Sequence, residues 1–369
     1  MSRGQVLQGT IALTDSRARI LGFDGLRAIA FLLVFVSHKS PWQVTECYGA
    51  AGVWMFFVLS GFLITRILAT SRREIEAGRS QIFPALVNFY VRRTLRIFPI
   101  YYLFLAVMAA LAAAGLMDLG GRYRQLADWL FLSNVYIEVY QQWGHLGHLW
   151  SLAVEEQFYL LFAPIALVLL SRRMLSICAG LIGISLLAHL GLFAAGAGRI
   201  HFDANSLVNF GLLGLGGLAG LRADRPLPKA LRGDLAIVVA LAAFLVVPAL
   251  LSMDVYLRFG RPSAIFIACL LVQAYQNQNG RAIALLNSGP FRRLGVISYG
   301  AYLIHVVIDC RAALRAAGFS GPAVEIAGVL LDLVLTIVLA TLSWRYYERP
   351  IRALAGRISV PTTTSAGPS

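Results

Sequence analysis

An apolar segment, residues 21–41, carries one arginine near its start, Arg27, and one histidine near its end, His38. Eleven helical steps of about 100° return to within roughly 20° of the starting direction and cover about 16 Å, so both side chains leave one helix face. Ionisable groups inside a membrane helix are costly and mark a polar path or a reaction site. The alternative is that Arg27 extends to the membrane surface and His38 caps the far end of the helix.

Two adjacent acids, Glu155 and Glu156, lie near the start of a later apolar segment, in the stretch HLWSLAVEEQFYL. The topology predicted below brings them to the same side of the membrane as His38. A histidine near a carboxylate is typical of a general base whose imidazolium form must be stabilised. The alternative is that Glu155 and Glu156 pair with nearby arginines as structure. Because adjacent residues on a helix point in different directions, one of the two acids can be structural even if the other serves the site.

Three arginines, Arg92, Arg93 and Arg96, precede the Phe98-Pro99 entry to another apolar segment. Guanidinium groups this close together can form a fork-shaped receptor for a phosphorylated ligand. The alternative for each arginine is an anchor on lipid phosphate.

Three polar residues near the end of the chain, Ser298, Tyr302 and His305, are spaced by four and three positions and share one helix face. A buried histidine serves either as hydrogen-bonded structure or as a catalyst, and both roles stay open for His305.

The composition requires a membrane protein to position these groups. The chain is 58% hydrophobic and 14% charged, with a mean hydropathy of +0.71, which leaves too little polar surface for a soluble domain. We predict an all-α bundle of about ten transmembrane helices, with residues 126–137 as an interfacial or re-entrant helix in an outer loop. The predicted spans are residues 21–41, 49–68, 97–117, 149–170, 175–195, 206–221, 235–251, 263–275, 294–308 and 324–344.

The net charge of +14 invites a nucleic-acid interpretation. The positive residues lie mostly on alternate loops, however, and no basic patch interleaved with aromatic residues is found, so we expect no nucleic-acid partner. The same distribution predicts cytosolic termini and a multi-pass protein of the cytoplasmic (inner) membrane, in contact with the lipid bilayer. We expect a cytosolic tail at 1–20, a membrane domain at 21–352, a disordered tail at 353–369 and no second soluble domain.

The four cysteines are scattered and lack the spacing of metal ligands, so no metal site is predicted. Cysteines in apolar helices usually behave as small hydrophobic residues. Cys47 and Cys310 are both expected near the outer face, where a disulfide between them is open but unsupported. The first apolar segment is followed by no small-residue cleavage site, which favours a retained helix.

Six motifs in order make the chain resemble the membrane-bound acyltransferase-3 family over about residues 21–352. One departure stands out: Trp54 occupies the lead to the second motif, where many members carry an acid, so no contact of that acid is carried over. The motifs are the Arg27–His38 pair, FFVLSGFLI (56–64), FYVRRTLRIFPIYY (89–102), HLWSLAVEEQFYL (148–160), ISYGAYLIH (297–305) and YERPIR (347–352).

The resemblance implies transfer of an acyl group, commonly acetyl, from coenzyme A to a hydroxyl of a carbohydrate or of a small molecule such as a macrolide. His38 then corresponds to the catalytic histidine and Arg27 to its partner. Arg93 and Arg96 match paired arginines associated with the donor, which is a substrate and not a resident cofactor. Ser151 and Glu155 match the Ser-x-x-x-Glu pattern of the fourth helix.

The mechanism expected on this basis has acyl-CoA entering from the cytosol onto Arg93, Arg96 and Arg92. His38, oriented by Glu155, removes the proton of the acceptor hydroxyl, either for direct transfer or after forming an acyl-enzyme. Backbone amides near Ser60-Gly61 or the Tyr302 hydroxyl are candidates for stabilising the oxyanion. The supporting residues are Ser60, Ser151, Glu156, Ser298, Tyr302 and His305.

Two other function classes compete with the acyltransferase. A transporter or flippase for an anionic lipid or sugar would line a permeation path with the same charges, although its inverted repeats are not seen, since each motif occurs once. A membrane sensor that kept the fold without catalysis is the third. The acyl group, the acceptor, the side on which it is modified and the oligomeric state are left open.

Overall fold

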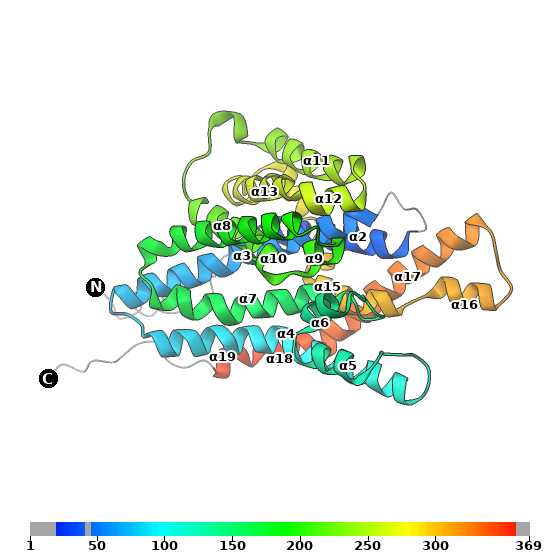
Figure 1. Ribbon diagram of the computed structural model, residues 1–369. Coiled ribbons are helices and arrows are strands. Elements are labelled where there is room, and N and C mark those ends of the chain that lie inside the picture. The colour runs from blue at the N-terminus through cyan, green and yellow to red at the C-terminus, as the bar shows by residue number, and fades with distance from the viewer. Residues whose placement is uncertain (1–19, 41–45, 359–369) are drawn as a thin grey trace, which may run out of the picture.

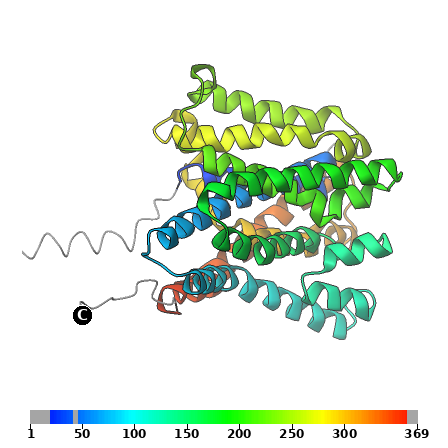
Figure 2. The same cartoon turned by 60° about the vertical axis from the view of Figure 1, so that its left-hand side comes forward.

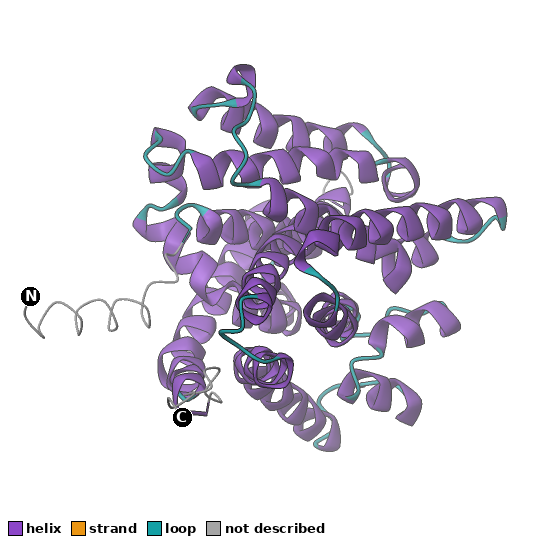
Figure 3. Ribbon diagram, turned by 90° about the vertical axis from the view of Figure 1, so that its left-hand side faces the viewer, coloured by secondary structure: helices purple, strands orange, loops and turns teal. Residues whose placement is uncertain are grey.

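The computed structural model describes residues 20–40 and 46–358, and within these ranges every regular element is a helix (Figures 1 and 3). The predicted tails, through residue 19 and from residue 359, lie outside the described residues. Residues 353–358, assigned to a disordered tail, instead close the helical part of the chain. The principal helices are α2 (Phe23–Lys39), α3 (Glu46–Glu76), α4 (Ile82–Ala113), α7 (Leu149–Val168), α8 (Met174–Ala194), α10 (Ser206–Arg222), α11 (Asp234–Leu250), α13 (Ala264–Gln276), α15 (Gly289–Ile304) and α17 (Pro322–Ser343).

Seven helical stretches are long and apolar enough to cross a membrane, and the number rises to eight if a bent pair counts as one span. That pair is α12 (Met253–Phe259) with η4 (Arg261–Ser263) and α13, which meet at 66°. The all-helical multi-pass membrane architecture is therefore confirmed. The number ten is not established, because α2 and α11 have only 17 residues each.

The two longest helices extend well beyond the apolar segments that predicted them. α3 continues through Arg72 to Glu76, and α4 begins at Ile82 instead of at residue 97. Arginine is a good helix former, so a run of arginines need not end a helix where it leaves the apolar layer. Arg92, Arg93 and Arg96 consequently project from a continuous helix and not from a loop.

The outer segment predicted as one interfacial helix is two short helices, α5 (Arg122–Trp129) and α6 (Ser133–Tyr140). Phe131, between them, has a φ of 54°, which is uncommon for a non-glycine residue and stops the helix. Arg124 and Asp128 form a buried pair in α5, with Nε and Oδ2 3.3 Å apart.

Glycines allow the central helices to touch backbone to backbone. A Cβ at Gly61 of α3 would lie 1.9 Å from the carbonyl oxygen of Leu213, and one at Gly216 of α10 would lie 2.0 Å from that of Val58. The α3–α10 contact therefore needs both glycines, as expected for small residues between membrane helices. Gly295 of α15 meets the Asp24 carbonyl of α2 in the same way. Figure 2 shows the resulting layers of nearly parallel helices.

Candidate active site

Three cavities follow one another along the central helices. A wide one, the arginine cavity, measures about 970 Å³ and is lined by Arg27, Arg66, Arg96 and Arg352. A narrow one, the middle cavity, measures about 60 Å³, and the third, the histidine cavity, about 460 Å³. Arg27 and Arg96 line both the arginine and the middle cavities, and Tyr302 lines both the middle and the histidine cavities. The shared side chains place the three cavities next to one another, with the narrowest in the middle.

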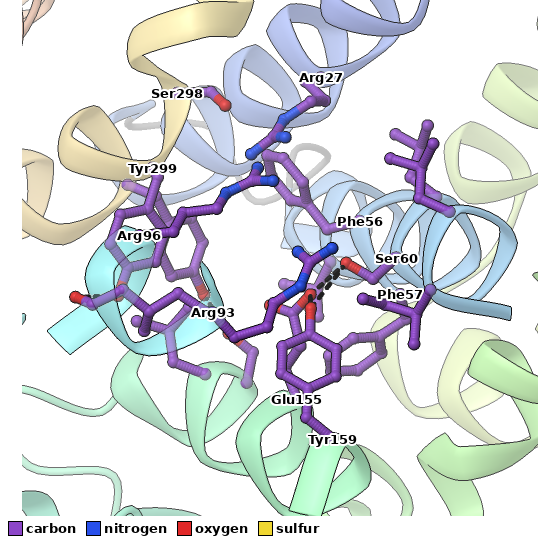
Figure 4. A pocket seen from close by; sticks show the side chains of 18 residues that line it. Arg27, Phe56, Phe57, Ser60, Arg93, Arg96, Glu155, Tyr159, Ser298 and Tyr299 are labelled. Carbon is purple, nitrogen blue, oxygen red and sulfur yellow. Dashed lines mark hydrogen bonds between the residues drawn. The ribbon is translucent and has the colours of Figure 1, made fainter. Parts of the chain in front are cut away.

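The middle cavity carries a strong excess of positive charge. Arg27, Arg93 and Arg96 line it (Figure 4), and Glu155 is the only acid among its lining residues. Within the described residues, no acid lies within ion-pair distance of any of the three arginines, and Nε of Arg27 is buried without a hydrogen-bond partner. A cavity with unpaired guanidinium groups suits an anionic ligand.

The Glu155 carboxylate is held by two hydroxyl groups. Ser60 of α3 and Tyr159, one turn along α7, both donate hydrogen bonds to Oε1 of Glu155 (Figure 4). Tyr159 also lies under Arg93, whose guanidinium carbon is 5.5 Å from the ring centroid. From the sequence, Tyr159 is named only as part of the HLWSLAVEEQFYL motif (148–160) and not as a candidate site residue. Its spacing of four from Glu155 was the signal that it would reach the same site.

Glu155 does not contact His38, contrary to the expected orienting role. No hydrogen bond joins them in the described residues, and they line different cavities, Glu155 the middle one and His38 the histidine one. The reason is depth, since Glu155 lies more than one helical turn from the start of α7 at Leu149, whereas His38 lies at the end of α2. Glu156 lines none of the three cavities, and its Oε1 is buried without a partner.

The partner of His38 is His305. Nδ1 of His38 lies 2.8 Å from Nε2 of His305, with the rings stacked at 8°. Nδ1 of His305 lies 2.7 Å from the carbonyl oxygen of Tyr302, which can only accept, so this nitrogen carries the hydrogen. In the neutral pair Nε2 of His305 is then the acceptor and His38 Nδ1–H the donor. Nε2 of His38 keeps its lone pair, as a general base requires.

His148 lines the histidine cavity together with His38, whereas His305 lies behind His38 and is not among the lining residues. Nε2 of His148 donates to the Leu303 carbonyl at 3.1 Å, which leaves Nδ1 buried with a lone pair and no partner. Ser151 lies 2.7 Å from the Tyr302 hydroxyl, which in turn donates to the His148 carbonyl at 3.0 Å. α7 and α15 are thereby tied together beside His305. His148 is the first residue of the HLWSLAVEEQFYL motif, but its spacing from other residues gave no reason to predict it as a site residue.

Two of the expected groups make helix hydrogen bonds, although Ser298 also lines the middle cavity, and one of the expected donor arginines lies away from the cavities. The Ser298 hydroxyl donates to the Gly295 carbonyl one turn earlier in its own helix. The backbone amides of Ser60 and Gly61 lie inside the continuous helix α3, where each N–H already serves the helix, so they cannot form an oxyanion hole. Arg92 is exposed and lines none of the three cavities, unlike Arg93 and Arg96.

A buried ion pair clamps the elements that carry the two stacked histidines. Nζ of Lys39, next to His38, lies 3.5 Å from Oδ2 of Asp332 in α17, and both side chains are almost fully buried. Lys39 also donates to the Ile308 carbonyl, and Oδ1 of Asp332 accepts from the Cys310 amide at 2.7 Å. The pair therefore joins the end of α2 to the segment that follows His305.

The cysteines and metal-binding residue types add nothing to this site. All four cysteines are free, so Cys47 and Cys310 form no disulfide. Among residues 20–40 and 46–358, no group of three or more His, Cys, Asp or Glu side chains is arranged to hold a metal ion. Trp54 is buried, stacked on Tyr256 with centroids 4.5 Å apart, and lines none of the three cavities.

Comparisons with known proteins place the chain in a family. Residues 20–345 match the family described as an acyltransferase domain. The peptidoglycan O-acetyltransferase OatA of Listeria monocytogenes is 28% identical over 91% of this chain and 56% of its own length. The O-acetyltransferase OatA of Staphylococcus aureus is 28% identical over 90% of this chain and 57% of its own length. The chain thus spans about half the length of the curated relatives it matches. No solved structure matches it.

Proposed function

The chain belongs to the acyltransferase-3 family, and we propose that it is an O-acetyltransferase of the cytoplasmic membrane that modifies a cell-envelope carbohydrate. The names of the relatives, which specify O-acetylation and in one case peptidoglycan, support the acetyl group and the glycan. The observation that carries the proposal is the free lone pair on Nε2 of His38, fixed by the His305 contact in a cavity large enough for a sugar.

The donor in this proposal is acetyl-CoA, bound from the end of the molecule that opens into the arginine cavity. Its phosphates would lie among Arg27, Arg96 and Arg352, none of which forms an ion pair in the described residues. The slender pantetheine arm would pass the narrow middle cavity, beside Arg93 and Glu155, which has to widen to admit it. The thioester would then reach Tyr302, where the middle and histidine cavities meet.

The acceptor hydroxyl comes from the histidine cavity. Nε2 of His38 takes the hydroxyl proton while the oxygen attacks the thioester carbonyl carbon. The tetrahedral intermediate expels the coenzyme A thiolate, the C–S bond breaks, and the imidazolium returns the proton to sulfur. His305 keeps Nδ1–H of His38 engaged, so the ring does not have to turn between the two proton transfers.

The test is transfer of labelled acetyl from acetyl-CoA in membranes that contain the wild-type protein or His38→Ala. We measure free thiol release and label incorporated into a cell-envelope glycan extract. Both should be present for the wild type and lost for the variant. Full activity in the variant would refute the role of His38, and absence of thiol release in the wild type would refute the acyltransferase. Movement of a labelled lipid or sugar without thiol release would favour the transporter instead, because a transporter cleaves no thioester.

A further inference from the structure

The histidine cavity holds a carboxylate that the mechanism above does not use. Asp203, in α9 (Arg199–Ala204), lines this cavity together with His38 and His148. The residue is buried, with a relative exposure of 7%. Oδ1 is fully enclosed and has no hydrogen-bond partner. Within the described residues no group donates a hydrogen bond to either carboxylate oxygen, and no cation lies within ion-pair distance.

A buried carboxylate without a donor is costly, and natural proteins rarely leave one unsatisfied without a use. Nearby arginines do not satisfy Asp203. Arg261 uses its Nη atoms on the Phe202 carbonyl and on Asn209, and its buried Nε has no hydrogen-bond partner. Arg199, which also lines the cavity, is exposed and makes no ion pair with Asp203. The Asp203 backbone is fixed as well, since Asn209 donates to its carbonyl at 2.6 Å. The backbone of Asp203 is therefore held in place, and its carboxylate lacks a donor.

The rest of the cavity wall suits a carbohydrate. Trp143 and Trp150 supply flat apolar faces for the C–H groups of a sugar ring, and Nδ1 of the buried His148 is a second acceptor without a partner. Few precisely placed polar groups in a largely apolar wall are typical of a small-molecule site. The acceptors on Asp203 and His148 call for a ligand with several donors, not for one with a single hydroxyl.

We propose that Asp203 accepts a hydrogen bond from a second hydroxyl or an acetamido N–H of the acceptor sugar, and so selects which hydroxyl reaches His38. This inference rests on the proposed function and names the substrate class of the same site: a polyhydroxylated or N-acetylated sugar. A macrolide-like acceptor with an isolated hydroxyl would leave the carboxylate unsatisfied. Asp203 acts as a specificity residue, and the proton transfer belongs to His38.

The experiment measures acetyl transfer by membranes carrying wild type, Asp203→Asn or Asp254→Asn to glycan fragments from digested peptidoglycan, with acetyl-CoA as donor. Asn keeps the volume of Asp but loses the charge-assisted hydrogen bond. We expect Asp203→Asn to raise the acceptor KM about 10- to 100-fold, with the donor KM within about twofold. Asp254, exposed and paired with Arg258, is the matched control and should behave as wild type.

Three outcomes of this experiment would contradict either the role of Asp203 or the proposed function. An unchanged acceptor KM in Asp203→Asn, with normal transfer by the wild type, overturns the assignment of Asp203 and leaves the proposed function intact. No transfer by the wild type overturns the proposed function itself. A rise in the KM of both donor and acceptor together with a lower melting temperature in detergent shows a structural role and also overturns the assignment. In that case the milder Asp203→Glu variant should show the same rise in both KM values and the same lower melting temperature.

Discussion

The rings of His38 and His305, 267 residues apart in the chain, are stacked at 8° with Nδ1 and Nε2 separated by 2.8 Å. His305 occupies the position that a carboxylate holds beside many catalytic histidines: it accepts the hydrogen of one ring nitrogen and leaves the other free. A neutral acceptor stabilises an imidazolium less than a carboxylate does. The arrangement therefore favours orientation of His38 over charge stabilisation.

Replacement of His305 tests this orienting role. His305→Ala should lower kcat by about 100-fold or more, because His38 can then present the wrong tautomer or turn away. His305→Gln offers a carbonyl oxygen as acceptor and should recover part of the loss. Steady-state transfer of labelled acetyl measures both. Equal activity of the two variants would argue that His305 only fills space.

The arginines of α4 should affect the donor KM differently, depending on whether they line a cavity. Arg96→Met removes a guanidinium that lines two cavities, and we expect the donor KM to rise about tenfold. Arg92→Met removes an exposed guanidinium from the same helix and should leave the donor KM unchanged. Titration of acetyl-CoA at fixed acceptor concentration distinguishes them, and a larger effect at Arg92 would contradict the route through the arginine cavity.

Glu155 and Glu156 form a matched pair of adjacent acids with different surroundings. Glu155→Ala removes the acceptor of the Ser60 and Tyr159 hydrogen bonds and leaves three arginines of the middle cavity without a counter-charge. We expect kcat/KM for the donor to fall at least about tenfold. Glu156→Ala lies outside the cavities and should cost stability more than transfer. Full transfer by Glu155→Ala would remove this residue from the site.

The Lys39–Asp332 pair should control stability near the histidines. Asp332→Asn leaves Lys39 buried without its counter-charge, which typically costs about 3–5 kcal/mol. The double variant Lys39→Met, Asp332→Leu removes both charges and should recover most of the melting temperature. Thermal unfolding in detergent measures the melting temperatures of the wild type and both variants. If the double variant were no more stable than Asp332→Asn, the pair would not act as a unit.

Asp128, in the short helix α5, makes stability depend on pH. Burial raises the pKa of its carboxyl from 3.8 to about 6, against the opposing effect of Arg124. The folded protein thus binds this proton more tightly than the unfolded chain, so the contribution is present below about pH 4 and is lost as pH rises to about 6. The melting temperature should fall across this window more for wild type than for Asp128→Asn. Asp118→Asn, at an exposed position, should keep the wild-type slope.

The sequence by itself determined the membrane class, the helical architecture, the family and the candidates that line the cavities. Hydrophobic composition and motif order carry this information locally, because a segment long and apolar enough to span a bilayer must be helical. The same local rules misjudged the starts of helices. Arg92, Arg93 and Arg96 were placed before a helix, although arginine is compatible with the helix they belong to.

Only the tertiary structure decided which candidates meet. Helical spacing gives the face on which Glu155 or His38 lies, but not its depth relative to residues on other helices. The close glycine contacts of α3 with α10 and of α2 with α15 limit how far these helices can slide along one another. That packing puts His305, and not Glu155, beside His38, and leaves Asp203 unpartnered in the same cavity. Such contacts join residues hundreds of positions apart, so no periodicity within one segment encodes them.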